Sequence, residues 1–239
     1  HPLTYPGPWP TASSLLQGDR LLPLDRLTHP DRTPVLAVGS NACPAQLRHK
    51  MDEFGIESPV PMTKVEVTGL DVGVSAHVSR MGYVSSSPVN APGVSRELFV
   101  IWLDDEQLRV VDASEGARSA EGNYARVLLP EPEFRVDLEN GHVVRGTYAY
   151  VNRHGVLHDG TGTPRRHADQ RTLIGELLKG SAELRRLFGG TPEEFCARAR
   201  ADAELCERGT RLLREEKLVT VSGLEYLTAP RRRGRNAST

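Results

Sequence analysis

The fold is decided by the stretch Val35-Leu-Ala-Val-Gly39-Ser-Asn-Ala-Cys-Pro44-Ala-Gln-Leu-Arg-His-Lys-Met-Asp-Glu-Phe-Gly55. The apolar run 35–38, which ends at Gly39, is typical of a short buried strand. Between Pro44 and Phe54 the apolar residues recur at helical spacing, and Gly55 follows them as a terminator. The stretch therefore predicts a strand, a turn at Gly39 and a helix.

Outward from this unit, the hydrophobic pattern predicts more strands and then helices. Alternating or continuous apolar runs predict strands at 60–70, 72–78, 98–103, 124–129, 134–138, 143–151 and 218–227. A charged segment at 104–114 with apolar residues on one side predicts a short helix, and helical spacing dominates from about 166 to 214. We therefore expect an α+β fold: a small, mostly antiparallel β-barrel or sheet with flanking helices, followed by C-terminal helices.

Changes in composition divide the chain into four parts. Residues 1–33 are rich in Pro and Leu without a clear period and predict an extended N-terminal arm. Residues 34–190 form the main domain, and residues 191–228 are expected to form a helical extension packed on it. Residues 229–239 contain a compact run of arginines and predict a disordered basic tail.

Composition excludes several classes of protein. The 239 residues carry 30 Lys+Arg against 31 Asp+Glu, a formal charge of −1, which disfavours a basic nucleic-acid binder. No run of 18 apolar residues occurs, so we expect no membrane-spanning helix. Three cysteines outside any CxxC pair, together with no visible signal peptide, predict a cytoplasmic protein, and the preference for arginine over lysine suggests a bacterial one.

The turn after the first strand is the strongest local signal for chemistry. Gly39 permits the backbone conformation of a tight turn, and the amides that follow it can converge on an anion. The N-terminus of the predicted helix adds partial positive charge at the same point. A carboxylate or a developing oxyanion could bind there.

A second signal is the segment Asp112-Ala-Ser-Glu115-Gly116, which follows the predicted helix and precedes Tyr124. Together with Val38-Gly-Ser-Asn41, the stretch from Gly82 to Gly93 and the strand Leu98-Phe-Val-Ile-Trp102, it resembles the γ-glutamylcyclotransferase-like family in content and order. The resemblance covers roughly residues 34–180. This chain departs from the family pattern where Val38 replaces a tyrosine and where Arg165, Arg166 and His167 follow Pro164.

The resemblance implies a reaction and a set of residues. The α-amine of a γ-glutamyl amine, dipeptide or metabolite would attack its own γ-carbonyl and release 5-oxoproline, with Glu115 as the acid/base. The substrate would be bound by Val38, Gly39, Ser40, Asn41, Ala42, Tyr124 and Tyr148. A small molecule is the expected partner, and neither a metal nor a cofactor is expected.

Other readings remain open from the residues alone. A non-catalytic relative could bind a small anionic ligand or a protein partner, and an unrelated interaction protein could dock a partner through its helical tail. His154, His158 and His167 have tolerable spacing for metal ligands, but the glycines between them favour a polar hairpin. Cys43 could act as a nucleophile, although a small buried filler is the simpler interpretation. His77 is expected to be a packed, hydrogen-bonded histidine.

Overall fold

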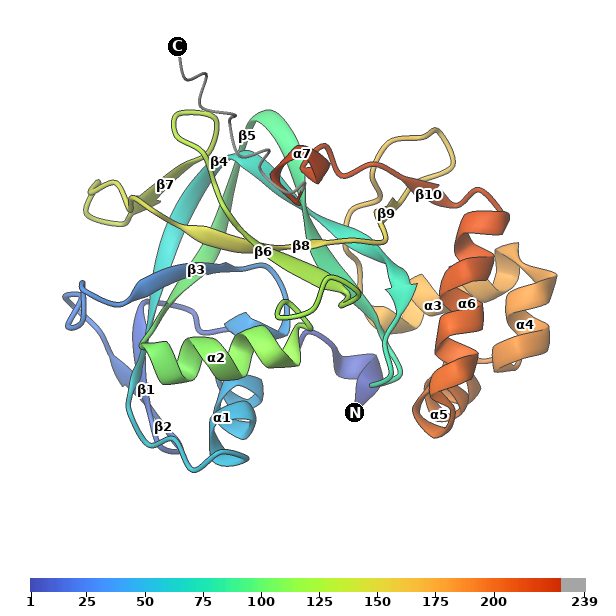
Figure 1. The fold of residues 1–239 in the computed structure, drawn as a ribbon, viewed down its shortest axis with the longest axis horizontal. Coiled ribbons are helices and arrows are strands. Elements are labelled where there is room, and N and C mark those ends of the chain that lie inside the picture. The colour runs from blue at the N-terminus through green and yellow to red at the C-terminus, as the bar shows by residue number, and fades with distance from the viewer. Residues whose placement is uncertain (229–239) are drawn as a thin grey trace, which may run out of the picture.

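A computed structural model describes residues 1–228, and the predicted basic tail at 229–239 lies outside this range. In the described range the strands are β1 (Ser14–Gln17), β2 (Arg20–Pro23), β3 (Thr33–Ala37), β4 (Val60–Val78), β5 (Val84–Leu103), β6 (Tyr124–Leu128), β7 (Arg135–Leu138), β8 (Tyr148–Asn152), β9 (Val156–Leu157) and β10 (Val219–Thr220). The helices are the 3₁₀ turns η1 (Pro2–Thr4) and η2 (Ser40–Ala42), then α1 (Pro44–Asp52), α2 (Asp105–Ser114), α3 (Gln170–Gly180), α4 (Ala182–Phe188), α5 (Pro192–Ala201), α6 (Ala203–Glu215) and α7 (Glu225–Thr228). The α+β class predicted from the sequence is confirmed (Figure 1).

One mostly antiparallel sheet organises the molecule. The strand order is β10-β9-β4-β5-β3-β8-β6, with β1 and β7 also paired to β4, and only the β3–β8 pair is parallel. The long strands β4 and β5 form an antiparallel pair that continues from Met62 opposite Ile101 to Val78 opposite Val84. Its register shifts after Thr68 and again after Val74, which bends the pair.

Alternation along the strands builds two apolar clusters on opposite faces of the sheet. Val35 and Ile101 lie on the face that packs against α1 and α2. Leu36 and Val100 point the other way, into a cluster that also contains residues of β6, β7 and β8 and is closed by Leu224. Because side chains alternate along a strand, this short central element supports both clusters at once.

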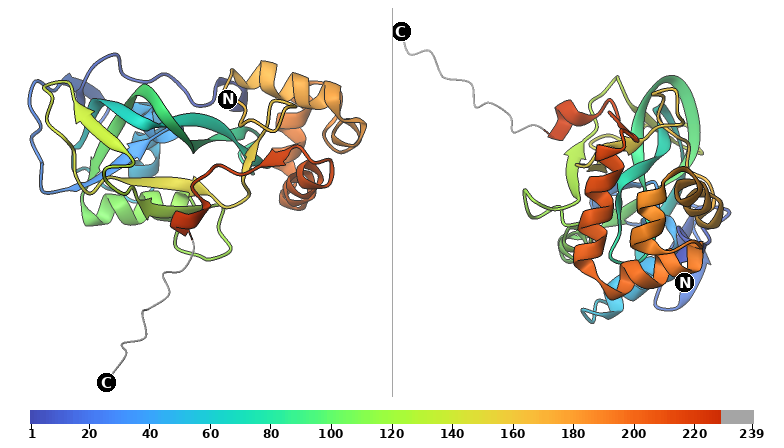
Figure 2. Two further views of the ribbon diagram at one scale, coloured as in Figure 1. Left: turned by 90° about the horizontal axis from the view of Figure 1, so that it is seen from above. Right: turned by 90° about the vertical axis from the view of Figure 1, so that its right-hand side faces the viewer.

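Helices α3 to α6 gather at one end of the molecule, and the N-terminus lies beside them (Figure 2). Their apolar faces pack on the far ends of β4 and β5 in a third cluster, which includes Val78, Val84 and Phe188. Capping residues define the helix starts: Thr191 caps α5 with a capping box, and Asp202 caps α6.

Several local predictions were wrong in their bounds. The strands expected at 60–70 and 72–78 are one continuous strand, because Gly69 bends the chain without ending its pairing. The segment 218–227 forms only the two-residue β10 and then α7, and 143–147 precedes rather than belongs to β8. Within the predicted N-terminal arm, β1 and β2 form a hairpin that pairs with β4.

Two helical glycines give a matched test of the packing of α6 on β4. A Cβ at Gly209 would lie 2.6 Å from the ring of Phe188 and 3.2 Å from Val78, whereas a Cβ at Gly175 in α3 would meet nothing within 4 Å. We expect Gly209→Ala to lower the free energy of unfolding by about 1–3 kcal/mol through overpacking. Gly175→Ala should raise it by up to about 1 kcal/mol through helix propensity. Urea denaturation measures both, and an equal gain in the two variants would contradict this packing.

Candidate active site

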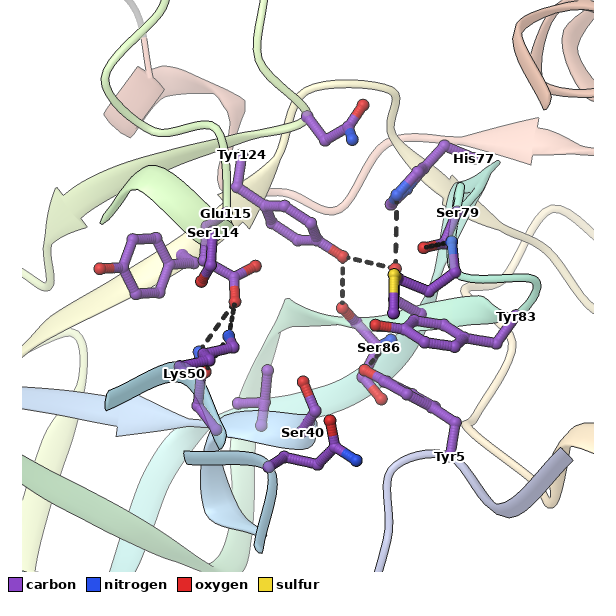
Figure 3. A pocket seen from close by; sticks show the side chains of 18 of the residues that line it. Tyr5, Ser40, Lys50, His77, Ser79, Tyr83, Ser86, Ser114, Glu115 and Tyr124 are labelled. Carbon is purple, nitrogen blue, oxygen red and sulfur yellow. Dashed lines mark hydrogen bonds and ion pairs between the residues drawn. The ribbon is translucent and has the colours of Figure 1, made fainter. Parts of the chain in front are cut away.

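A cavity of about 280 Å³ opens where β3 ends and η2 begins. Its walls come from distant parts of the chain: the N-terminal arm, η2 and α1, the facing ends of β4 and β5, the end of α2, and strands β6 and β8 (Figure 3). Its lining residues are Tyr5, Leu36, Val38, Gly39, Ser40, Asn41, Gln46, His49, Lys50, Glu53, His77, Ser79, Met81, Tyr83, Ser85, Ser86, Ser114, Glu115, Asn123, Tyr124 and Tyr150.

The turn after β3 leaves two backbone donors unused. The N–H of Ala42 donates to the carbonyl of Gly39, and the N–H of Cys43 donates to the carbonyl of Ser40. The N–H groups of Ser40 and Asn41 have no acceptor within residues 1–228. Both residues line the cavity, and amides left free in such a turn can serve an anionic oxygen of a ligand.

Glu115 lies at the end of α2 and is held by one of its two carboxylate oxygens. Oε1 accepts a hydrogen bond from Nδ2 of Asn41 at 3.0 Å and lies 3.2 Å from Nζ of Lys50. Nζ of Lys50 also donates to Oδ1 of Asn41 at 2.8 Å, which closes a three-residue cluster. The side chain of Glu115 is only 16% exposed and that of Lys50 is 17% exposed. Among the described residues Oε2 has no partner, so this oxygen is the one available to a ligand.

Four tyrosines surround this carboxylate and remain protonated near neutral pH. Burial raises the pKa of Tyr5, Tyr83, Tyr124 and Tyr150, and the negative charge of Glu115 contributes to the rise in each case. The pKa of Tyr83 rises to about 12. These phenols can therefore donate hydrogen bonds, but none of them can act as a base at neutral pH.

His77 is buried on the opposite wall, in a single neutral form. The amide oxygen of Asn152 accepts from the N–H of His154, which turns Nδ2 of Asn152 towards Nδ1 of His77 at 3.0 Å. Nδ1 must therefore accept, and the ring proton sits on Nε2, which faces Oγ of Ser85 at 3.5 Å. Burial lowers the pKa of His77 to about 3, with a smaller contribution from the charge of His154. His77 is thus a donor and not a base.

The remaining titratable groups of the lining lie at the rim. Nε2 of His49 on α1 and Oε1 of Glu53 at the C-cap of that helix lie 3.6 Å apart, and these side chains are 70% and 59% exposed. Within the part of the chain that the structure describes, Glu115 is therefore the one shielded group of the cavity with a free proton-accepting atom.

The structure brings together most of the residues that the sequence nominated. Glu115, Tyr124 and the turn residues 38–41 line one cavity. Ala42 does not, because its side chain is buried in the core beneath the turn, and Tyr148 does not, because its ring packs under the guanidinium of Arg126 at 4.8 Å. Tyr150 lies two residues after Tyr148 on the same face of β8. It lines the cavity, and its hydroxyl donates to Oδ1 of Asp112 at 2.7 Å.

Sequence reasoning missed Tyr5, Lys50, Tyr83, Tyr150 and the hydroxyls of Ser85 and Ser86. The local spacing of Lys50 on α1 could have suggested that it faces the turn, since it lies nine residues after Asn41. Nothing local marks Tyr5, which reaches the cavity from an arm without a regular pattern.

The geometry supports neither of the two minor hypotheses from the sequence, a metal site at the histidines and a nucleophilic Cys43. His154 bonds to Asn123 and His158 to the carbonyl of Lys217, and residues 1–228 contain no group of three His, Cys, Asp or Glu side chains that could hold a metal ion. Cys43 is buried against Gly7 of the arm and does not line the cavity. Over the same described range, no helix is both long enough and apolar enough to cross a membrane.

Comparisons with known proteins found only remote similarities. No family model and no curated protein matches the chain. Among solved structures, it is similar to a gamma-glutamyl cyclotransferase (12% identity, TM-score 0.41, covering 75% of this chain and 98% of that one). It is also similar to the uncharacterized protein loc79017 from Homo sapiens (15%, TM-score 0.38, 50% and 66%) and to YkqA from Bacillus subtilis (14%, TM-score 0.38, 80% and 56%). Likeness this remote assigns no activity to the chain.

The buried neutral His77 predicts a specific sensitivity to acid. Its folded pKa of about 3 lies below the ordinary value of 6.5, so the unfolded chain takes up a proton first as the pH falls. Its contribution to stability is complete above pH 6.5 and is lost as the pH falls towards 3. At about pH 4.5 the loss should amount to about 2–3 kcal/mol.

His77→Gln should remove this part of the loss. The measurement is the free energy of unfolding in urea at about pH 7 and about pH 4.5, with His142→Gln, at an exposed position, as the control. A pH dependence that is the same in His77→Gln as in the wild type would show that His77 is not held neutral.

Proposed function

We propose that this protein is a γ-glutamylcyclotransferase-like enzyme that releases 5-oxoproline from a γ-glutamyl amine, dipeptide or metabolite. One observation carries the proposal: the shielded carboxylate of Glu115 is anchored through Oε1 and open through Oε2, in the same cavity as the two unused N–H groups of Ser40 and Asn41. A base next to donors for an anionic oxygen is the arrangement that an acyl-transfer reaction requires.

In the proposed reaction, Oε2 of Glu115 takes a proton from the α-ammonium of the substrate. The freed amine attacks the γ-carbonyl carbon, a C–N bond forms, and the carbonyl oxygen becomes an oxyanion. Glu115 then returns the proton to the leaving nitrogen as the original amide C–N bond breaks. It next takes the second proton that the ring nitrogen still carries and passes it to the released amine, which leaves as an ammonium. The products are 5-oxoproline and the released amine, and Glu115 regains its starting state.

The chain supplies two effects of known size to this step. A positioned acid/base contributes about 10²–10⁴-fold in rate, and one preorganised donor to an oxyanion contributes about 3 kcal/mol. The hydrogen bonds from Asn41 and Lys50 fix Oε1, so Oε2 approaches the substrate from a defined direction. The protonated tyrosines wall the cavity without competing for the proton.

The choice of a γ-glutamyl substrate rests on the resemblance of the motifs around Gly39 and Glu115 to the family. A second candidate is a non-catalytic relative that binds a small anionic ligand or a protein partner. The pairing of Lys50 with Glu115 favours this alternative, because the ammonium engages the carboxylate that the reaction needs as a base. Val38, in place of the family tyrosine, favours it as well.

The test is 5-oxoproline release from a panel of γ-glutamyl amines and dipeptides. We expect turnover by the wild type and a loss of about 10²-fold or more in kcat for Glu115→Gln, which keeps the shape of the side chain but cannot accept the proton. Glu53→Gln is the matched control, since it changes a carboxylate at the rim of the same cavity and should leave kcat within about two-fold.

Other outcomes have distinct meanings. Equal activity in wild type and Glu115→Gln would remove Glu115 from the acid/base role. If no compound of the panel releases 5-oxoproline, while the folded protein still binds small anions in the cavity, the binding protein is favoured over the enzyme.

A further inference from the structure

The N-terminal arm places a tyrosine in the cavity. Residues 2–4 form η1, which packs against α3 and α5, and Gly7 lies so close to Sγ of Cys43 that a Cβ there would be 2.6 Å away. Between these two contacts the ring of Tyr5 stacks on Tyr83, with centroids 4.2 Å apart and planes 23° apart. Tyr5 is therefore a fixed part of the wall (Figure 3).

The hydroxyl of Tyr5 is held against the turn after β3. Its oxygen accepts the backbone N–H of Ser86 at 2.9 Å. It also lies directly over Gly39, where the oxygen would clash with any Cβ. Gly39 is followed by the two free N–H groups of Ser40 and Asn41, so three donors border the same part of the cavity.

Among the described residues, the hydroxyl of Tyr5 has no acceptor for its proton, whereas His77, Ser85 and Tyr124 each donate to one. Tyr124 donates to the carbonyl of Ser86 at 3.0 Å, so Ser85 must donate to Tyr124 at 2.8 Å, and Nε2 of His77 donates to Ser85. Within residues 1–228, no oxygen or nitrogen accepts from the O–H of Tyr5 in hydrogen-bond geometry, although the hydroxyl of Ser86 lies beside it.

Ser86, whose hydroxyl lies beside that of Tyr5, supplies a second sign of a ligand. The residue is 4% exposed and lines the cavity, yet its Oγ has no partner in hydrogen-bond geometry within the described chain. A buried hydroxyl without a partner costs about 1–3 kcal/mol, which a bound polar group would offset.

We propose that Tyr5 is a ligand-binding residue whose O–H, with the neighbouring hydroxyl of Ser86, binds the carboxylate of an amino-acid-type ligand, which leaves the N–H groups of Ser40 and Asn41 for the oxyanion of the proposed reaction. The inference rests on the proposed function, and it names the part of the substrate that these donors recognise. Oε2 of Glu115 provides the complementary acceptor for the ammonium of the same ligand. A zwitterion matches this cavity because the Lys50–Glu115 pair leaves its interior without net charge.

The test measures binding in the absence of turnover. The probes are L-5-oxoproline and its carboxamide, which differ only in the carboxylate, titrated by calorimetry into the wild-type protein and variants. We expect the wild type to bind the acid at least about ten-fold more tightly than the carboxamide. Tyr5→Phe, which keeps the ring and its stacking, should weaken binding of the acid about 10–100-fold and change binding of the carboxamide little.

Two further variants separate recognition from folding. Gly39→Ala keeps the phenol but pushes its oxygen off the turn, so it should lose the same preference for the acid. Tyr226→Phe removes a hydroxyl that bonds to Glu133 outside the cavity, and it should bind both probes as the wild type does. Thermal unfolding establishes that each variant is folded.

The outcomes distinguish this inference from the proposed reaction. If the wild type prefers the acid and Tyr5→Phe keeps that preference, the role of Tyr5 is overturned and the reaction is untouched. If the wild type binds neither probe, or binds both equally, the carboxylate site is overturned. If Tyr5-dependent binding of the acid persists but no γ-glutamyl compound is turned over, the site stands and the reaction is rejected.

Discussion

The rest of the structure depends on the pairing of β4 with β5. These two strands carry the sheet from the cluster under α1 and α2 to the helices at the other end, and β4 also pairs with β1, β7 and β9. Within β5, only the segment 99–103 pairs with β3, so the other ends of β4 and β5 extend beyond the end of β3. The cavity lies in that step, with His77 on β4 and Ser85 and Ser86 on β5.

Burying polar groups at this position imposes a strict directionality on the hydrogen bonds. Each buried donor needs an acceptor, and Asn152 fixes the first link by donating to His77. From there the protons run one way through Ser85 and Tyr124 to the carbonyl of Ser86. The chain of donors rigidifies one wall, while the carboxylate of Glu115 on the other wall keeps one oxygen open. One wall of the cavity thus has a fixed direction of hydrogen bonds from His77 to the carbonyl of Ser86, and the other presents one carboxylate oxygen of Glu115 that is free within the described chain, which suits the positioning of a small polar ligand.

Local sequence was sufficient for those parts of the fold and site that depend on local physics. The strand before Gly39, the helix after it and the helix at 104–114 that ends beside Glu115 follow from periodicity and turn chemistry. The single strand 60–78 was not predictable, because Gly69 marks a bend whose continued pairing depends on β5. Tyr148, which the sequence nominated, and Tyr150 lie on the same face of β8, and only the sheet register decides which of them meets the cavity.

One part of the chain outside the sequence motifs around Gly39 and Glu115, the N-terminal arm, lines this cavity through Tyr5. The arm reaches it through η1, which rests on α3 and α5, so the C-terminal helices hold the segment that presents Tyr5. The family pattern has a tyrosine where this chain has Val38, and here a tyrosine approaches the adjacent Gly39 from outside the strand. The position of the Tyr5 phenol is set by stacking on Tyr83 and by the N–H of Ser86, not by the hydrogen bonds between strands. The contacts of this phenol can therefore differ without any change in the pairing of β3. The arm and the helices that hold it therefore bear directly on which ligand the cavity formed by β3, the turn at Gly39 and Glu115 can accept.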